Sequence, residues 1–181
     1  MNVATTTLAE PQLPTRRCAA AGKYLTFKLG VEEFAIEVLK VREIMGVQHI
    51  TAVPQTPASV KGVINLRGKV VPVVDLRIRF GLPDTEYTAR TCIIVVQIHT
   101  TETLQMGIVV DEVCEVLNLV EGELQETPNF GHGISTPYLL GMAKVKGKVK
   151  ILLDIDHVLA SEEAAGLSEM IRSHREESAA Q

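Results

Sequence analysis

The sequence contains no tryptophan, and aromatic residues make up only 4% of its 181 positions. Few side chains are therefore available to stack on nucleic-acid bases or sugar rings. The formal net charge of −4 does not suit the attraction of a polyanion either, because binding to nucleic acid or anionic lipid needs clustered basic residues. Both properties argue against a nucleic-acid-binding small-barrel protein, an alternative that a salt-dependent binding assay would test.

The sequence also lacks the spacings that hold metals or build common catalytic sites. Its three cysteines, Cys18, Cys92 and Cys114, are scattered without a CxxC pair, and its five histidines share no metal-ligand spacing. No phosphate-binding loop, dinucleotide-binding glycine pattern or nucleophile elbow occurs. Because no nucleophile, base and orienting group can be assembled, we expect a protein that is not an enzyme and has no cofactor or metal.

Long hydrophobic runs are absent as well. The N-terminal residues contain no apolar core typical of a signal peptide, and no apolar segment approaches the roughly 18–20 residues that span a bilayer. Hydrophobic residues nevertheless make up 46% of the chain, an ordinary value for a globular protein. We therefore expect a cytoplasmic protein with reduced cysteines.

The sequence does contain an internal repeat. The segment VKGVINLRGKVVPVVDLRIRF, from Val60 to Phe80, is similar to LLGMAKVKGKVKILLDIDHVL, which lies 79 residues later. Two glycines and an aspartate coincide, and a basic residue, Arg67 or Lys146, stands at each predicted turn. Residues around Ile36 and Ile108 match at an offset of 72. The elements follow in the same order in both halves, which indicates a duplicated structural unit.

Short apolar or alternating runs separated by glycine and proline predict a mainly β fold. Asp75 and Asp154 end the two hairpins, where each is expected to cap a helical turn. Closed barrels suit such short strands, because closure removes exposed sheet edges. We predict two small five-stranded β-barrels, one at about residues 23–85 and one at about 90–155, partly completed by exchanged segments.

The two ends of the chain differ from this pattern. Residues 1–22 are rich in Thr, Ala and Pro without periodicity, and predict a disordered N-terminal arm. Near the other end, Leu167, Met170 and Ile171 recur at helical spacing. We predict a C-terminal helix at residues 156–175 and a frayed tail at 176–181.

Four motifs together resemble the CheW-like domain of bacterial chemotaxis: LKVREI, VPQTPASVKGVINLRGKVVPVVDLRIRFGL, MGIVVDEVCEVL and LLGMAKVKGKVKILLDI. The resemblance covers residues 23–163. It implies a fold of two Src-homology-3-like five-stranded barrels, in agreement with the repeat. It also implies a scaffold that couples chemoreceptor cytoplasmic tips (methyl-accepting chemotaxis proteins) to the regulatory domain of the histidine kinase CheA. The chain is too short to carry the catalytic domains of CheA or the receiver domain of CheV.

The resemblance further implies which residues contact the partners. The positions that match the receptor-binding groove are Val41, Glu43, Gly62, Arg67, Cys92, Ile93, Gly107 and Gly141. The positions assigned to kinase binding are Phe130, Ile44 and Val71. A core would not select charged residues such as Glu43 and Arg67, whereas the glycines can equally serve backbone geometry.

The resemblance also implies recruitment from the cytoplasm to membrane-associated receptor arrays. A CheW-like scaffold of a non-chemotactic receptor–kinase pathway, in motility or second-messenger control, uses the same surfaces and is the alternative function.

Overall fold

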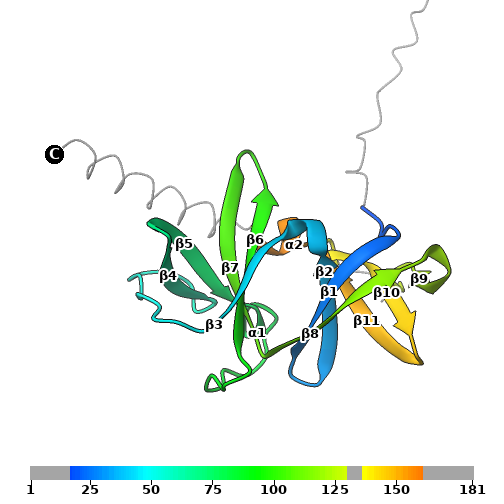
Figure 1. Ribbon diagram of the computed structural model, residues 1–181, viewed down its shortest axis with the longest axis horizontal. Helices are drawn as coiled ribbons and strands as arrows, with labels where there is room; N and C mark the ends of the chain where they lie inside the picture. The colour runs from blue at the N-terminus through cyan, green and yellow to red at the C-terminus, as the bar shows by residue number, and fades with distance from the viewer. Residues whose placement is uncertain (1–16, 130–135, 161–181) are drawn as a thin grey trace, which may run out of the picture.

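The computed structural model describes residues 17–129 and 136–160 (Figure 1). One set of strands comprises β1 (Gly22–Leu29), β2 (Glu32–Glu37), β8 (Glu112–Leu119), β9 (Leu124–Gln125), β10 (Leu139–Val145) and β11 (Lys148–Leu153). The other comprises β3 (Val41–Gly46), β4 (Val60–Leu66), β5 (Lys69–Asp75), β6 (Cys92–His99) and β7 (Thr103–Val110). The helical turns are η1 (Val38–Lys40), α1 (Leu76–Arg79), η2 (Glu121–Glu123) and α2 (Ile155–Leu159).

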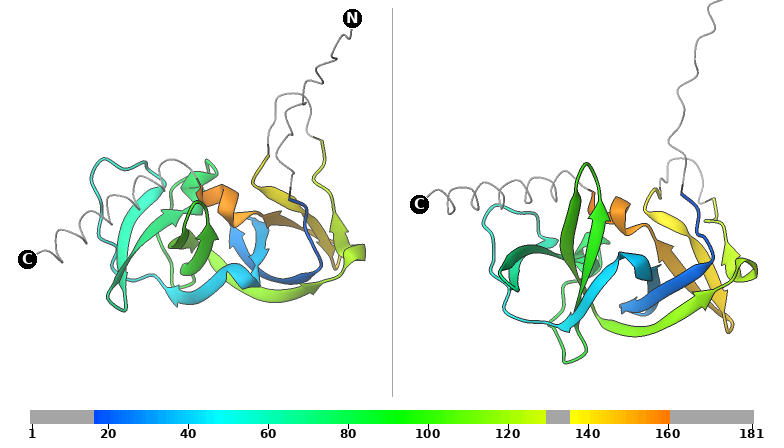
Figure 2. Two further views of the ribbon diagram at one scale, coloured as in Figure 1. Left: turned by 90° about the horizontal axis from the view of Figure 1, so that it is seen from above. Right: turned by 45° about the horizontal axis from the view of Figure 1, so that its top comes forward.

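The strands form two sheets that lie side by side (Figures 1 and 2). The first barrel is the five-stranded sheet β3-β6-β7-β5-β4, and the second barrel is the six-stranded sheet β8-β1-β2-β11-β10-β9. This architecture confirms the prediction of a mainly β protein built from two small units. Within the described residues, no helix is long and apolar enough to cross a membrane.

The two sheets have the same topology once the sequence repeat is applied to them. Replacing β8, β1, β2, β11 and β10 by their repeat equivalents gives β3, β6, β7, β5 and β4, which is the order of the first barrel. The residue pairing agrees as well. Val73 pairs with Gly107 in the parallel pair β5–β7, and the equivalent residues Leu152 and Ala35 pair in β11–β2. The repeat in the sequence is thus a repeat of strand register.

Each barrel takes strands from both halves of the sequence. β1 and β2, from the first half, lie in the second barrel, and β6 and β7, from the second half, lie in the first barrel. The predicted ranges of about 23–85 and 90–155 therefore describe the repeat units, and the exchanged segments are the first two strands of each. Local sequence patterns identify a strand but do not determine which neighbour it pairs with.

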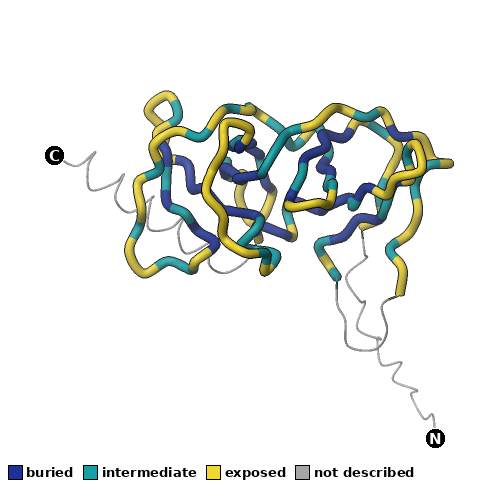
Figure 3. The backbone as a smooth tube through the Cα atoms, turned by 90° about the horizontal axis from the view of Figure 1, so that it is seen from below, coloured by how far each residue is buried: buried dark blue, intermediate teal, exposed yellow. Residues whose placement is uncertain are grey.

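Buried residues occur along the backbone of both barrels (Figure 3), and the apolar ones form three clusters. The first barrel encloses Ile64, Val71, Val73, Ile93, Val95 and Val109. The second encloses Tyr24, Ala35, Leu119, Leu140, Ala143 and Leu152. A larger core between the barrels includes Leu25, Phe27, Ile36, Ile94, Val96 and Ile108. β6 faces both a barrel interior and this inter-barrel core, which explains why the run from Ile93 to Val96 is apolar throughout and at most 1% exposed.

Both predicted hairpin turns require residues with positive φ. Arg67 and Gly68 have φ of 51° and 81°, and Lys146 and Gly147 have φ of 51° and 77°. Positive φ at both central residues is the geometry of a type I′ turn, whose twist matches that of the flanking strands. The basic residue at each apex therefore occupies a backbone position that holds its side chain outside the barrel.

Asp75 and Asp154 cap the helical turns that follow the hairpins, as predicted. The Asp75 carboxylate accepts a hydrogen bond from the Arg77 backbone N–H at 2.9 Å, and Asp154 accepts one from the His157 backbone N–H at 3.4 Å. Asp75 is only 1% exposed. Burial raises the pKa of the Asp75 carboxyl above its usual value, although the hydrogen bond from Arg77 acts in the opposite direction.

This raised pKa predicts a specific pH dependence. A carboxyl whose pKa is higher in the folded chain contributes stability below its unfolded pKa, and this contribution is lost as the pH rises through the folded pKa. The free energy of unfolding of the wild type, relative to Asp75→Asn, should therefore increase as the pH falls from neutral. Urea unfolding at several pH values measures it, with exposed Glu86→Gln as the control. Parallel pH profiles of the wild type and Asp75→Asn would contradict the expectation.

The structure describes residues 17–22 of the predicted N-terminal arm, and they contact the rest of the fold. The Ala19 backbone N–H donates to the Leu140 carbonyl at 3.0 Å, and the Tyr24 hydroxyl donates to the Ala20 carbonyl at 2.8 Å. Arg17 lies 3.5 Å from the carboxylate of Asp154. Residues 17–22 are thus part of the fold, because side-chain and backbone contacts with β10 and α2 hold a segment whose composition shows no periodicity.

The C-terminal helix was predicted at residues 156–175. Its first part coincides with α2, whereas residues 161–181, including the predicted tail, lie outside the described residues.

Candidate functional site

An exposed ion pair joins the two edge strands of the first barrel. Glu43 lies on β3 and Arg67 stands at the apex of the β4–β5 turn, and Arg67 Nη2 is 3.0 Å from Glu43 Oε1. The Arg67 side chain is 76% exposed and that of Glu43 is 28% exposed. β3 and β4 are the two edges of this sheet. The pair therefore places opposite charges on one rim of the barrel, where a partner can reach both.

A single row of paired residues connects Glu43 to the other candidates of the first barrel. Glu43 pairs with Val95, and Val95 pairs with Gly107. Gly107 pairs with Val73, which pairs with Gly62. Paired residues lie on the same face of a sheet. The structure thus brings Glu43, Gly62 and Gly107 into one row across all five strands.

Two of the candidates belong to the interior of the first barrel. Ile93 is fully buried. A Cβ atom added to Gly107 would lie 3.0 Å from Ile93 Cγ2 and 3.3 Å from Val73 Cγ2. Neither residue presents a surface to a partner. Their contribution to any site is indirect, because they set how closely β6, β7 and β5 pack.

Gly62 and Gly141 allow a neighbouring strand to approach closely. A Cβ atom on Gly62 would lie 2.0 Å from the Thr51 carbonyl oxygen, and one on Gly141 would lie 2.6 Å from the Gln125 carbonyl oxygen. Both glycines have positive φ, 137° and 155°. They are repeat equivalents in different barrels. The structure therefore does not bring Gly141 together with Gly62, and each glycine has a backbone role in its own barrel.

Val41 and Cys92 lie between the surface and the inter-barrel core. Both are half-buried and pack against that core from the first barrel. Val41 pairs with Val96, which is fully buried in the same core. The Cys92 Sγ lies 3.2 Å from the Arg90 carbonyl. Val41 lies two positions before Glu43 on β3, whereas Cys92 lies at the start of β6 and pairs with Gly46.

The three residues assigned to kinase binding have different positions. Ile44, next to Glu43 on β3, is 44% exposed. Val71 is 2% exposed, and its side chain packs inside the first barrel, so it does not form part of a contact surface. Side chains alternate between the two faces of a strand. The neighbouring Val70 therefore points outward, and this residue is 50% exposed. Phe130 lies outside the described residues.

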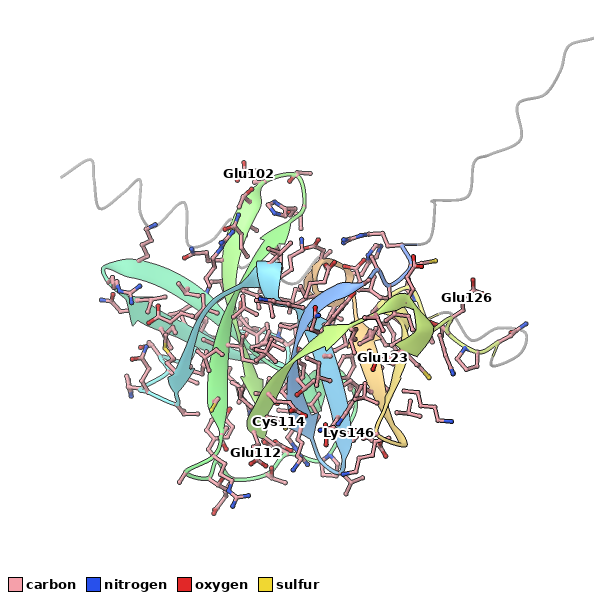
Figure 4. All side chains as sticks on the ribbon, turned by 45° about the vertical axis from the view of Figure 1, so that its right-hand side comes forward. Glu102, Glu112, Cys114, Glu123, Glu126 and Lys146 are labelled. Atoms are coloured by element: carbon pink, nitrogen blue, oxygen red, sulfur yellow. The ribbon has the colours of Figure 1, made fainter. Side chains whose placement is uncertain are left out.

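The repeat identifies exposed apolar residues that single positions did not reveal. Val116 is the equivalent of Ile44 and is 54% exposed, and Val149 is the equivalent of Val70 and is 53% exposed. Val116 lies on β8, which also carries Cys114, and Val149 lies on β11, which follows the turn at Lys146. Cys114 and Lys146 are labelled in Figure 4. Aligning the two halves residue by residue, beyond the hairpins, is the signal that would have found them.

The arrangement provides groups that can bind a partner. Among the residues that the structure describes, no group of three or more His, Cys, Asp or Glu side chains could hold a metal ion. The exposed charges of Glu43 and Arg67 can orient a partner, and adjoining apolar side chains can bury area against it.

Comparison with known proteins identifies the family of the chain. The sequence profile of the CheW-like domain matches residues 23–163. The chemotaxis protein CheW of Klebsiella aerogenes is 39% identical over 152 residues, which cover 84% of this chain and 90% of that protein. The chemotaxis protein CheW of Rhizobium meliloti is 36% identical over 139 residues, which cover 77% and 88%. The crystal structure of the scaffolding protein TtCheW from Thermoanaerobacter tengcongensis superposes with a TM-score of 0.70 at 31% identity, covering 80% of this chain and 96% of that one. The chain belongs to the CheW-like domain family.

Proposed function

We propose that this protein is a non-enzymatic scaffold of bacterial chemotaxis that couples chemoreceptors to the histidine kinase CheA. Relatives that match most of the chain at 36–39% identity are named chemotaxis protein CheW, and a protein of the same fold at 31% identity is called a scaffolding protein. Within the structure, the proposal is carried by the exposed Glu43–Arg67 pair. The proposal includes recruitment of the protein to receptor arrays at the membrane.

The ion pair suits a receptor contact better than a structural role. An exposed ion pair contributes only about 0–1 kcal/mol to stability, so the fold does not depend on it. Charges at the rim of an interface orient the partner and exclude wrong ones. We place the receptor contact at Glu43 and Arg67, with Val41 and Cys92 as apolar contacts and Gly62, Gly107 and Ile93 as the packing that supports them.

For the kinase, the proposal retains Ile44 and Phe130. Ile44 is an exposed aliphatic residue on β3, and Phe130 follows Pro128 and Asn129 in the connection between β9 and β10. Two separate apolar contacts would let the protein link neighbouring kinase domains in an assembly.

A co-sedimentation assay with receptor fragments and CheA tests the scaffold function, with each component omitted in turn. The protein should sediment with receptor fragments alone, bind CheA alone, and bring CheA to the receptor pellet only when all three are present. Absence of CheA from the ternary pellet would contradict the proposal. Receptor fragments of a non-chemotactic pathway that recruit this protein in place of chemoreceptors would favour the alternative function.

Replacing Phe130 with alanine should weaken assembly with the kinase and leave receptor binding unchanged. An aromatic side chain that anchors an interface contributes about 1–2 kcal/mol or more, and the candidate receptor residues lie on other elements. Receptor-controlled kinase activity measures the effect as reduced cooperativity. Val31→Ala is a matched truncation of a 92% exposed residue in the β1–β2 turn. Equal loss in both variants, or unchanged cooperativity in Phe130→Ala, would remove Phe130 from the kinase surface.

A further inference from the structure

A large apolar groove lies away from the candidate receptor residues. Its cavity volume is about 1090 Å³, and it is bounded by the β1–β2 turn, the segment from α1 to Pro83, the start of β10, and α2. None of the eight candidate receptor residues lines it. The apolar lining includes Phe34, Phe80, Tyr138, Leu139, Met142 and Ile151.

The groove holds an unusual share of the aromatic residues in this chain. Phe34 stacks on Phe80 with ring centroids 5.7 Å apart, and Phe80 contacts Tyr138 at 5.7 Å. Phe27 continues the row into the inter-barrel core. Phe34, Phe80 and Tyr138 are only half-buried. A protein with four phenylalanines thus leaves two of them, with a tyrosine, partly open to water in one groove, which is the mark of a binding surface.

The internal repeat shows that this surface is covered in the other barrel. The equivalents of Phe34 and Phe80 are Met106 and Leu159, which are 0% and 2% exposed. The equivalent of Ile151 is Pro72, which is buried, whereas Ile151 itself is half-buried. The same structural position is therefore closed in the first barrel and open in the second. The open face therefore leaves apolar area on which a further segment can pack.

The chain itself continues directly from the groove. Val158 of α2 lines it, and the described residues end two positions later at Ala160. The remaining 21 residues contain Leu167, Met170 and Ile171 at helical spacing. Leu167 follows Ala160 by seven residues, a length of about 10 Å as helix and up to about 24 Å when extended. The apolar face of this segment can therefore reach the groove that begins beside it.

We propose that residues 161–181 dock intramolecularly into this groove, with Leu167, Met170 and Ile171 placed against Phe34, Phe80 and Ile151. The C-terminal segment is then the occupant of the groove, in place of another protein. This inference is independent of receptor binding, since none of the candidate receptor residues lines the groove.

Paramagnetic relaxation in the full-length chain tests the docking. A nitroxide is attached at Glu169→Cys, opposite the predicted apolar face, after replacement of the three native cysteines. The methyl signals of Met142 and Ile151 should lose most of their intensity, whereas the methyl signals of Ile44 and Val70 in the first barrel should keep theirs. Undiminished signals from Met142 and Ile151 would overturn the proposal.

Two variants and a mixed sample make the result specific. Leu167→Asp combined with Ile171→Asp should restore the Met142 and Ile151 signals, whereas Ser168→Asp combined with Ser173→Asp, which adds the same charge off the apolar face, should not. Signal loss that survives the first pair would overturn the proposal. Mixing isotope-labelled chains with spin-labelled chains should cause no loss; a loss there would identify a second copy as the occupant and overturn intramolecular docking.

Discussion

Reversing the charge of Arg67 is expected to remove most of the receptor affinity and leave the fold intact. Arg67 is 76% exposed, and its ion pair with Glu43 is its only contact with a charged side chain among the described ion pairs. Loss of that pair should change the free energy of unfolding by about 1 kcal/mol or less. Against a receptor helix, Arg67→Glu replaces attraction by repulsion and should cost about 2–5 kcal/mol of binding free energy. Kinase binding, proposed to use Ile44 and Phe130, should persist.

Lys146→Glu is the matched control. Lys146 has the same φ of 51° in the equivalent turn of the second barrel, and the substitution changes the charge by the same amount. Co-sedimentation with receptor fragments and thermal unfolding measure both variants. If receptor binding is lost equally in both, a general charge effect explains it. If Arg67→Glu binds receptor fragments like the wild type, Arg67 is not part of the site.

A charge swap separates the two roles of the pair. Glu43→Arg combined with Arg67→Glu restores an ion pair within the barrel but reverses the charges that a receptor meets. Stability should return to that of the wild type, whereas receptor binding should remain weak. Recovery of binding in the double variant would show that the receptor needs the intact rim and not the individual charges.

The sequence predicted the individual strands and turns of the fold more completely than it predicted which strands pair with each other. Type I′ turns, strand ends and caps depend on local chemistry, such as the Arg67–Gly68 and Asp75 positions, and these agree with the structure. Exchanged segments were predicted from the family resemblance, but the local patterns do not show that the exchanged strands are β1–β2 and β6–β7. The exchange depends on which edge of which sheet is free when the halves fold together, and the two arrangements contain the same local pattern.

The same distinction applies to the candidate site. Charge identified Glu43 and Arg67, because charged side chains are rarely placed inside a core, and the structure does place both at the surface. The resemblance to a family indicates positions but not the direction of a side chain. Ile93 and Val71 were both assigned to contact surfaces, but the structure buries their side chains. Val70, one residue before Val71 on the same strand, is exposed. Contacts of Arg17 and Ala19 with distant residues carry no local signal at all.

Replacing Gly62 with alanine should destabilise the first barrel by about 3 kcal/mol or more. The new Cβ would lie 2.0 Å from the Thr51 carbonyl oxygen. That oxygen cannot move freely, because Thr51 and Val63 exchange two backbone hydrogen bonds of 2.9 Å. The φ of 137° adds strain for any residue with a side chain. Urea unfolding measures the loss.

Alanine substitutions at two other glycines serve as comparisons for the destabilisation expected at Gly62. Gly141→Ala should cost less, because the contact with the Gln125 carbonyl is 2.6 Å and β9 has only two residues. Gly46→Ala, with no heavy atom within 4 Å of the added Cβ, should change stability by less than about 1 kcal/mol. If Gly62 acts through the backbone, the folded fraction of Gly62→Ala should bind receptor fragments with reduced capacity but normal affinity per folded molecule. A variant that unfolds like the wild type yet loses receptor affinity would instead place Gly62 in direct contact with the receptor.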